Sequence, residues 1–247
     1  MSVDLEVAVQ NTAGMRIARE IGAARVELTQ ALSIGGLTPS RGTIELVREA
    51  GGESGPEVHV LIRPRAGGFH YDREEFAVME RDVRDALAAG AHGVVVGCQD
   101  ATGELDRDGL ERLRDAAGGA SVTLHRVIDT TPDPLGALRI ARELGLRRVL
   151  TSGGASRAVD GLDVLLALVR EAAGEIEVMA GSGITAADVA TVAGAGVDAV
   201  HFSAKRTVTV DVGVRLGSAS DGVGGHEVTD LDAARSIVDA LEKAHAA

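Results

Sequence analysis

The stretch Ala141-Arg-Glu-Leu-Gly-Leu-Arg-Arg-Val149 repeats, with small changes, the earlier stretch Ala18-Arg-Glu-Ile-Gly-Ala-Ala-Arg-Val26. Ala89-Gly-Ala-His-Gly-Val-Val95 and Ala195-Gly-Val-Asp-Ala-Val200 follow the same plan. Each reads as the end of a helix, a glycine, two or three further residues and then the start of an apolar strand. Glycine suits this position because the residue after a helix often has a positive φ. These stretches therefore predict a chain in which helices and strands alternate.

The alternation predicts an α/β protein with a single (β/α)8 TIM barrel that spans residues 1–247. Strict alternation implies parallel strands joined by right-handed crossovers, and eight units in 247 residues match this barrel. The open doubly wound sheet is less favoured, because the turn after the first strand, residues 10–14, lacks a Gly-x-Gly-x-x-Gly pattern. The eight apolar segments lie near residues 4–9, 25–29, 58–63, 93–97, 121–126, 148–151, 176–180 and 198–202.

The alternation of strands and helices stops at residues 204–228, between the eighth strand and the last helix. Alternating apolar residues from Val208 to Leu216 predict an extra strand, and the small polar residues 217–225 predict a loop. A loop that leaves the end of the eighth strand would lie over the barrel mouth, where lids are found. The alternative is a disordered surface insertion.

Composition limits the function classes. The net charge of −12 argues against a nucleic-acid partner, because binding to phosphates needs a basic face. The first residues do not form a secretory signal, and no apolar run approaches the roughly 20 residues of a membrane span. Cys98 is the only cysteine, so no internal disulfide is expected. The sequence predicts a soluble cytoplasmic protein without a membrane partner.

Several strands carry charged residues that are candidates for chemistry. Glu6 and Glu27 lie inside the first two strands, where a buried carboxylate needs a cation or hydrogen-bond donors. Arg63 and Arg65, at the end of the third strand, could supply them. Both glutamates are candidate catalytic residues, and the alternative is a buried ion network that only orients the barrel.

The Arg63-Pro64-Arg65 segment places two guanidinium groups on one strand parity, a pattern that favours binding of a carboxylate or phosphate. The alternative is a surface ion pair with Asp72 or Glu74. The glycine-rich turn after the seventh strand offers backbone N–H groups to an anion, although such turns also occur for steric reasons. We expect one site for a small anionic ligand, with these candidate binding residues: Arg63, Arg65, Arg126, Ser152, Gly181, Ser182, Gly183 and Ser203.

Two histidines end strands and could act as general acids or bases. His125 ends the fifth strand, with Asp129 nearby to orient it, and His201 ends the eighth. The alternative for each is a buried, hydrogen-bonded histidine. The candidate catalytic set is therefore Glu6, Glu27, His125, Asp129 and His201. We expect Glu6, Glu27, His125 and His201 to converge with Arg63 and Arg65 at the carboxyl end of the barrel.

The chain resembles the CutC copper-homeostasis family. The resemblance rests on segments in family order: Leu-Glu-Val (5–7), Arg-Val-Glu-Leu (25–28), Gly-Gly-Leu-Thr-Pro-Ser (35–40), Ile-Arg-Pro-Arg-Ala-Gly-Gly-Phe (62–69), Leu-His-Arg-Val-Ile-Asp (124–129), Leu-Thr-Ser-Gly (150–153), Met-Ala-Gly-Ser-Gly-Ile (179–184) and Val-His-Phe-Ser (200–203). It implies a TIM barrel, a cytoplasmic location, homo-oligomers and a link to copper handling.

Copper is the only metal or cofactor that the resemblance implies. Proposals for copper binding in the family rest on cysteines after Leu-Glu-Val/Ile and Val-Glu-Leu, and here these positions are Ala8 and Thr29. Copper(I) prefers soft thiolates, and the chain has neither of these cysteines, so any metal ligands stay unknown from the sequence. Two functions stay open: a copper-homeostasis protein, or a TIM-barrel enzyme that performs acid–base chemistry on a small anionic or phosphorylated substrate.

Overall fold

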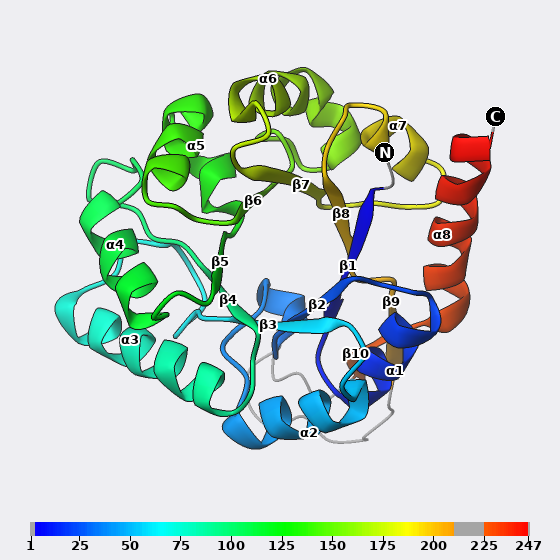
Figure 1. Cartoon of the computed structure of the whole chain (residues 1–247), viewed down its shortest axis with the longest axis horizontal. Helices are drawn as coiled ribbons and strands as arrows, with labels where there is room; N and C mark the ends of the chain where they lie inside the picture. The colour runs from blue at the N-terminus through cyan, green and yellow to red at the C-terminus, as the bar shows by residue number, and fades with distance from the viewer. Residues whose placement is uncertain (1–2, 210–224, 247) are drawn as a thin grey trace.

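Eight parallel strands form a closed barrel in the order β1 to β8, with β8 hydrogen-bonded to β1, and helices surround it (Figure 1). The computed structural model describes residues 3–209 and 225–246. It confirms the (β/α)8 fold expected from the sequence. The barrel strands are β1 (Asp4–Val9), β2 (Arg25–Leu28), β3 (Glu57–Leu61), β4 (Gly93–Val96), β5 (Ser121–Leu124), β6 (Arg148–Thr151), β7 (Glu177–Gly181) and β8 (Ala199–Phe202).

The outer layer consists of helices that follow the strands in turn. They are α1 (Thr12–Glu20), α2 (Arg41–Gly51), α3 (Arg73–Ala88), α4 (Arg107–Ala116), α5 (Pro134–Glu143), α6 (Leu162–Ala172), α7 (Val189–Ala193) and α8 (Leu231–Ala246). Capping residues determine where several of these helices begin. Asp72 and Glu75 form a reciprocal capping box at the start of α3, and Asp133 caps α5 just before Pro134.

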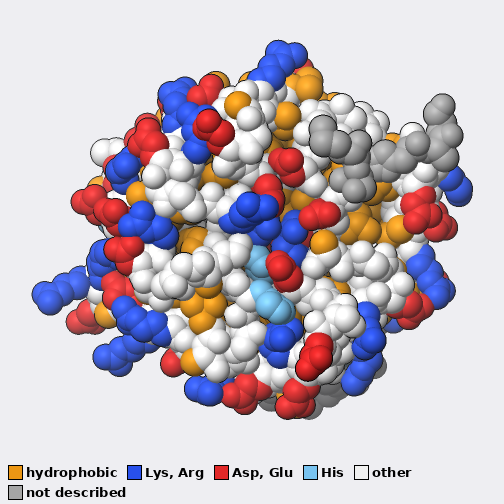
Figure 2. All heavy atoms as spheres, viewed as in Figure 1, with side chains coloured by type: hydrophobic (Ala, Val, Ile, Leu, Met, Phe, Trp, Pro, Cys, Tyr) orange, Lys and Arg blue, Asp and Glu red, His pale blue; other side chains and the backbone are white. Residues whose placement is uncertain are grey.

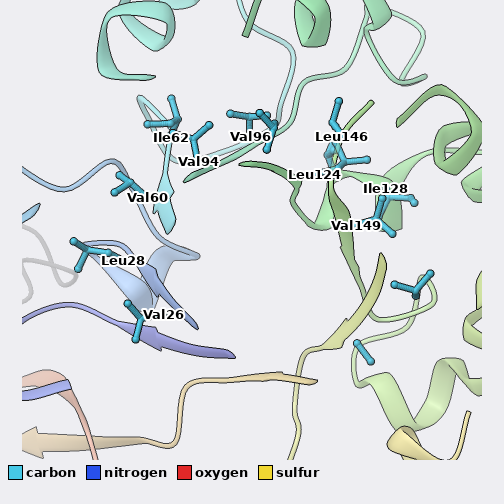
Figure 3. Close-up of a cluster of buried hydrophobic side chains, with 14 of the residues drawn as sticks. Val26, Leu28, Val60, Ile62, Val94, Val96, Leu124, Ile128, Leu146 and Val149 are labelled. Carbon is cyan, nitrogen blue, oxygen red and sulfur yellow. The ribbon is translucent and has the colours of Figure 1, made fainter. Parts of the chain in front are cut away.

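The main hydrophobic core lies between the strands and the helices. Alternate strand residues, such as Val26 and Leu28 on β2 or Val60 on β3, are fully buried in this layer. Figure 3 shows such side chains around the outside of the strand ring. Burying each one contributes about 1.5–3 kcal/mol. The remaining strand residues consequently face the barrel interior.

The barrel interior is unusually polar. TIM barrels usually fill it with branched apolar residues, but here an apolar interior cluster of described residues contains just Leu150, Met179 and Ala199. Arg148 reaches across from β6 to His59 on β3, with 3.4 Å between Nη1 and Nδ1. Charged and histidine side chains also gather near the centre of the face seen in Figure 2. The buried polar residues on these strands include Glu6, Arg25, Glu27, His59, Thr123 and Arg148.

The segment after β8 contains two more strands, β9 (Lys205–Thr209) and β10 (Gly225–Thr229), which pair antiparallel. The hairpin lies beside α1 (Figure 1), and the Gln10 side chain donates to the carbonyl of Glu227 at 3.1 Å. Residues 210–224, which contain most of the predicted extra strand (208–216) and of the predicted lid-like loop (217–225), lie outside the described residues. Within residues 3–209 and 225–246, no helix combines the length and apolar character needed to cross a membrane.

Candidate active site

Glu6, His201 and Glu27 meet inside the barrel. Pairing of β1 with β8 places Glu6 opposite His201. His201 Nδ1 lies 2.9 Å from Glu6 Oε1, and His201 Nε2 lies 3.5 Å from Glu27 Oε2. The Glu6 side chain is 1% exposed, whereas those of Glu27 and His201 are 10% and 13% exposed. The structure thus brings three predicted catalytic residues together, with Glu27 and His201 nearer to solvent.

Arg25 supplies the cation that we expected from Arg63 and Arg65. Its Nε donates to Glu6 Oε2 at 3.2 Å, and its Nη1 donates to Asp4 Oδ2 at 3.0 Å. The sequence interpretation missed Arg25. Strand parity could have found it, because Arg25 and Glu27 are two residues apart on one strand and must share a face.

The carboxyl groups of Glu6 and Glu27 have very different pKa values. Burial raises the pKa of Glu6, but the hydrogen bond from His201 and the charges of His201, His59 and Arg25 outweigh it and lower the pKa to about 2. Burial raises the pKa of Glu27 to about 7, with a counteracting contribution from His201 and a further increase from Glu6. Neighbouring carboxyl groups with separated pKa values are typical of acid–base sites.

His201 lies between these two carboxyl groups. Burial lowers the pKa of His201, but the hydrogen bond with Glu6 and the charges of Glu27 and Glu6 raise it by more, so the net shift is upward. The raised pKa favours an imidazolium between the two carboxyl groups. Glu6 orients the ring from one side, which leaves Nε2 to face Glu27.

A second cluster joins the loops after β5, β6 and β7. Arg126 donates from Nε to Asp129 Oδ2 at 2.7 Å, from Nη2 to Ser152 Oγ at 2.9 Å and from Nη1 to Ser182 Oγ at 3.1 Å. Asp129 also accepts from Thr151 Oγ1 at 2.6 Å and from the backbone N–H groups of Ser152 and Gly154 at 3.0 Å. Asp129 therefore orients Arg126, and the expected pairing of Asp129 with His125 is corrected.

The turn Gly181-Ser182-Gly183 passes close to His201. A Cβ on Gly181 would lie 3.1 Å from His201 Cβ and 2.6 Å from Leu150 Cδ1, so only glycine leaves room for this ring. Ser182 has φ of 95°, a conformation that L-residues rarely adopt. Its hydroxyl donates to the Ser156 carbonyl at 2.7 Å. Strain of this kind concentrates at functional sites.

His125 is held separately by its own backbone. Its Nδ1 accepts from the Val127 N–H at 3.0 Å, and its ring packs on Phe69 with 4.7 Å between centroids. Burial and then the positive charge of Arg63 lower the pKa of His125 to about 3. Gly97 makes room for the ring, since a Cβ there would lie 2.4 Å from Cε1. A neutral His125 can donate a hydrogen bond but is a poor base at neutral pH.

The expected meeting of all anion-binding candidates at one position is corrected. Arg63 donates to the carbonyls of Ile34 and Gly36 at 3.1 Å and of Gly67 at 2.7 Å. Arg65 is exposed and pairs with Glu75, so an ion pair forms as in the alternative, although with a different partner. Ser203 lies elsewhere, beside Gln10, Lys205 and Glu227. Both arginines lie beyond the end of β3 at Leu61, so the alternation of side chains along a strand does not set where they point.

Cys98 and the residues at positions 8 and 29 do not offer the ligands that copper(I) prefers. Cys98 is buried, its Sγ lies 3.6 Å from the Asp106 carbonyl, and burial raises the pKa of the thiol. Thr29 Oγ1 is occupied by the carbonyls of Gln30 and Leu37 at 3.1 and 3.0 Å, and Ala8 has no ligand atom. The part of the chain that the structure describes also contains no group of three His, Cys, Asp or Glu residues arranged for a metal ion.

The CutC family model matches residues 3–206. The chain belongs to the CutC family. It is 42% identical over 241 residues to a CutC family protein of Xanthomonas campestris pv. campestris (strain B100), covering 97% of this chain and 99% of the relative. A CutC family protein of Sinorhizobium medicae is 48% identical over 181 residues, 73% of this chain and 72% of the relative.

A comparison with a solved structure supports the same family assignment. The crystal structure of the putative copper homeostasis protein CutC from Streptococcus agalactiae is 29% identical, with a TM-score of 0.78, and the match covers 82% of this chain and 99% of that chain. The CutC family protein that we describe also shares its fold with 3-hexulose-6-phosphate synthase from Salmonella typhimurium, at 17% identity and a TM-score of 0.63 over 98% of this chain and 100% of that one. At that identity the likeness concerns the fold alone.

Proposed function

We propose that this CutC family protein is an enzyme that moves a proton on a small anionic substrate at the mouth of its barrel. The observation that carries the proposal is the buried row Glu6–His201–Glu27, in which the pKa of one carboxyl is about 2 and that of the other about 7. A general base works best when its pKa lies near the operating pH. Glu27 meets this condition at neutral pH.

Each side chain has a distinct role in this proposal. Glu27 accepts a proton from the substrate, the bonding electron pair stays on the substrate, and Glu27 returns the proton to another substrate atom. Glu6 remains ionised and keeps the His201 ring oriented. Arg126 places a positive charge near His201, and its side chain is 41% exposed, so it attracts an anionic substrate to the mouth. The substrate class is a small carboxylate or phosphorylated compound.

Hydrogen exchange tests the proton transfer directly. A panel of sugar phosphates and small carboxylates would be incubated in D2O and examined by mass spectrometry for uptake of carbon-bound deuterium. We expect wild type to label at least one compound and Glu27→Gln to label it at least ~100-fold more slowly, because general acid–base catalysis contributes about 10²–10⁴-fold. Glu175→Gln, an exposed surface change, is the control and should retain the wild-type rate. Absence of exchange across the panel, or full exchange by Glu27→Gln, contradicts the proposal.

Family membership also suggests a place in copper homeostasis, in the cytoplasm and as a homo-oligomer. We infer that the chain contributes there without thiolate ligation of copper. The support is chemical: the one cysteine is buried with a raised thiol pKa, and copper(I) favours thiolate ligands.

Copper(I) competition against a chromogenic chelator tests this inference. Wild type and Cys98→Ala should withdraw copper(I) equally and weakly. Tighter binding by wild type than by Cys98→Ala would contradict it.

A further inference from the structure

Arg63 is a buried cation whose partners are all neutral. Within the described residues, three arginines are at least nine-tenths buried: Arg25, Arg63 and Arg148, with exposures of 4%, 7% and 3%. Arg25 pairs with Glu6, and Arg148 pairs with Glu177 at 2.9 Å. The Arg63 guanidinium donates to carbonyl oxygens of the loops around it, and its Nε–H has no hydrogen-bond partner among the described residues. A buried charge without a counter-charge is costly, so this environment favours an anion.

His125 offers a second free donor in the same neighbourhood. Its Nδ1 accepts from the Val127 N–H, so the neutral ring must carry its hydrogen on Nε2. That atom is buried and has no partner within residues 3–209 and 225–246. Burial and then the positive charge of Arg63 lower the pKa of His125, which keeps the ring in this neutral donor form.

Phe69 covers both groups. Its ring centroid lies 4.7 Å from that of His125 and 5.2 Å from Arg63 Cζ. The ring is partly exposed and follows Gly67, whose φ of 92° only glycine adopts readily. Tyr71, two residues further, is also buried, and its hydroxyl has no partner among the described residues. A partly exposed aromatic side chain thus lies over buried, unsatisfied donors.

We propose that Arg63 and His125 form a closed subsite for a small oxyanion, a carboxylate or phosphate group, with Phe69 as its cover. Both free groups can only donate, and an oxyanion would accept from both while neutralising the Arg63 charge. The Arg126 cluster is a different location, because its donors are occupied by Asp129, Ser152 and Ser182. The subsite extends the proposed function by binding a second part of the substrate, but anion binding there does not require proton transfer by Glu27.

Inorganic phosphate is the probe for this subsite. Titration at constant ionic strength would be followed by the NMR signal of the His125 Nε2–H and by thermal unfolding. We expect phosphate to perturb this signal and to raise the melting temperature, since a ligand that binds the native state stabilises it. Phe69→Ala uncovers the donors and should strengthen phosphate binding.

Paired arginine variants locate the site. Arg63→Lys keeps the charge but loses the planar fork, so phosphate affinity should fall by roughly tenfold or more. Arg65→Lys, with its exposed ion pair to Glu75, is the matched control and should keep wild-type affinity. If Arg63→Lys does not fold, His125→Gln serves in its place and should also weaken binding.

Some outcomes overturn the proposal. A His125 signal that does not respond to phosphate in wild type or in Phe69→Ala would do so, as would equal affinities for wild type and Arg63→Lys. These readouts are independent of deuterium exchange. Loss of phosphate binding with intact exchange would reject the subsite alone, and the converse would reject the proton transfer alone.

Discussion

Single residues at this site show how neighbours decide the state of a carboxyl group. Glu6 and Glu27 are both buried, but Glu6 touches two cationic side chains, Arg25 at 3.2 Å and His201 at 2.9 Å. Glu27 has only the more distant Nε2 of His201, at 3.5 Å. Pairing with cations overcomes desolvation at Glu6, whereas desolvation dominates at Glu27. One carboxyl therefore stays ionised while the other can exchange its proton.

Replacing Glu27 by Gln should stabilise the protein at pH 8 by about 1–3 kcal/mol more than at pH 5. The pKa of Glu27 is about 7 in the folded chain, above the ~4.3 of a glutamate in an unfolded chain. Between these values the folded state binds a proton that the unfolded state lacks, so the free energy of unfolding falls as pH rises through this window. Glutamine has no proton to lose. Urea denaturation at both pH values measures the difference, and an equal effect at pH 5 and pH 8 would contradict the assignment.

Replacing Arg25 by Met should destabilise the fold by about 3–5 kcal/mol at pH 7, because it leaves the buried charge of Glu6 without its arginine partner. The double variant Arg25→Met/Glu6→Gln should recover much of this loss. Arg41→Met, which removes an exposed ion pair with Glu45, is the control and should cost about 1 kcal/mol or less. Denaturant unfolding gives all three values. A loss at Arg25 no larger than at Arg41 would show that the ion pair is unimportant.

Among the elements, the loops after β5, β6 and β7 are joined by the side chains of Arg126 and Asp129. The C-terminal end of α6, by contrast, carries backbone strain. Helix α6 ends at Ala172, and the next residue, Ala173, has φ of 49° and is exposed. Alanine in this left-handed conformation costs about 1–2 kcal/mol, whereas glycine adopts it freely. The end of α6 is thus a place where stability can be gained without touching the site.

Ala173→Gly should raise the free energy of unfolding by about 0.5–1 kcal/mol. The matched control is Ala240→Gly inside α8, which should lower it by about 1 kcal/mol because glycine is a poor helix former. Both are measured by denaturant unfolding. Destabilisation by Ala173→Gly would show that the left-handed conformation is not the limiting feature there.

At the scale of the whole molecule, the sequence predicts the barrel better than it predicts the site. Apolar periodicity, glycines after helices and caps such as Asp72 act over short distances, so they locate elements correctly. The alternation of side chains along β1 and β8 also explains why Glu6 and His201 both face the barrel interior. It does not say how far a long side chain reaches, which is why Arg65 was expected at the mouth but pairs with Glu75. Arg25 was missed although β1 and β2 pair directly and place it opposite Glu6, whereas His201 on β8 reaches Glu6 only because the barrel closes.

The pKa of Glu27 decides whether this side chain can transfer a proton at neutral pH, and NMR titration measures it. The protein would be labelled with ¹³C at glutamate side-chain carboxyl groups and followed by NMR from pH 4 to 9, with Glu27→Gln to assign the signal and Glu177→Gln as a control. We predict one carboxyl that titrates near pH 7, because burial raises the pKa of Glu27 to about 7, and this signal should be absent from Glu27→Gln and unchanged in Glu177→Gln. A Glu27 carboxyl that is fully ionised by about pH 5, as in an ordinary solvated glutamate, would contradict the proton-transfer site.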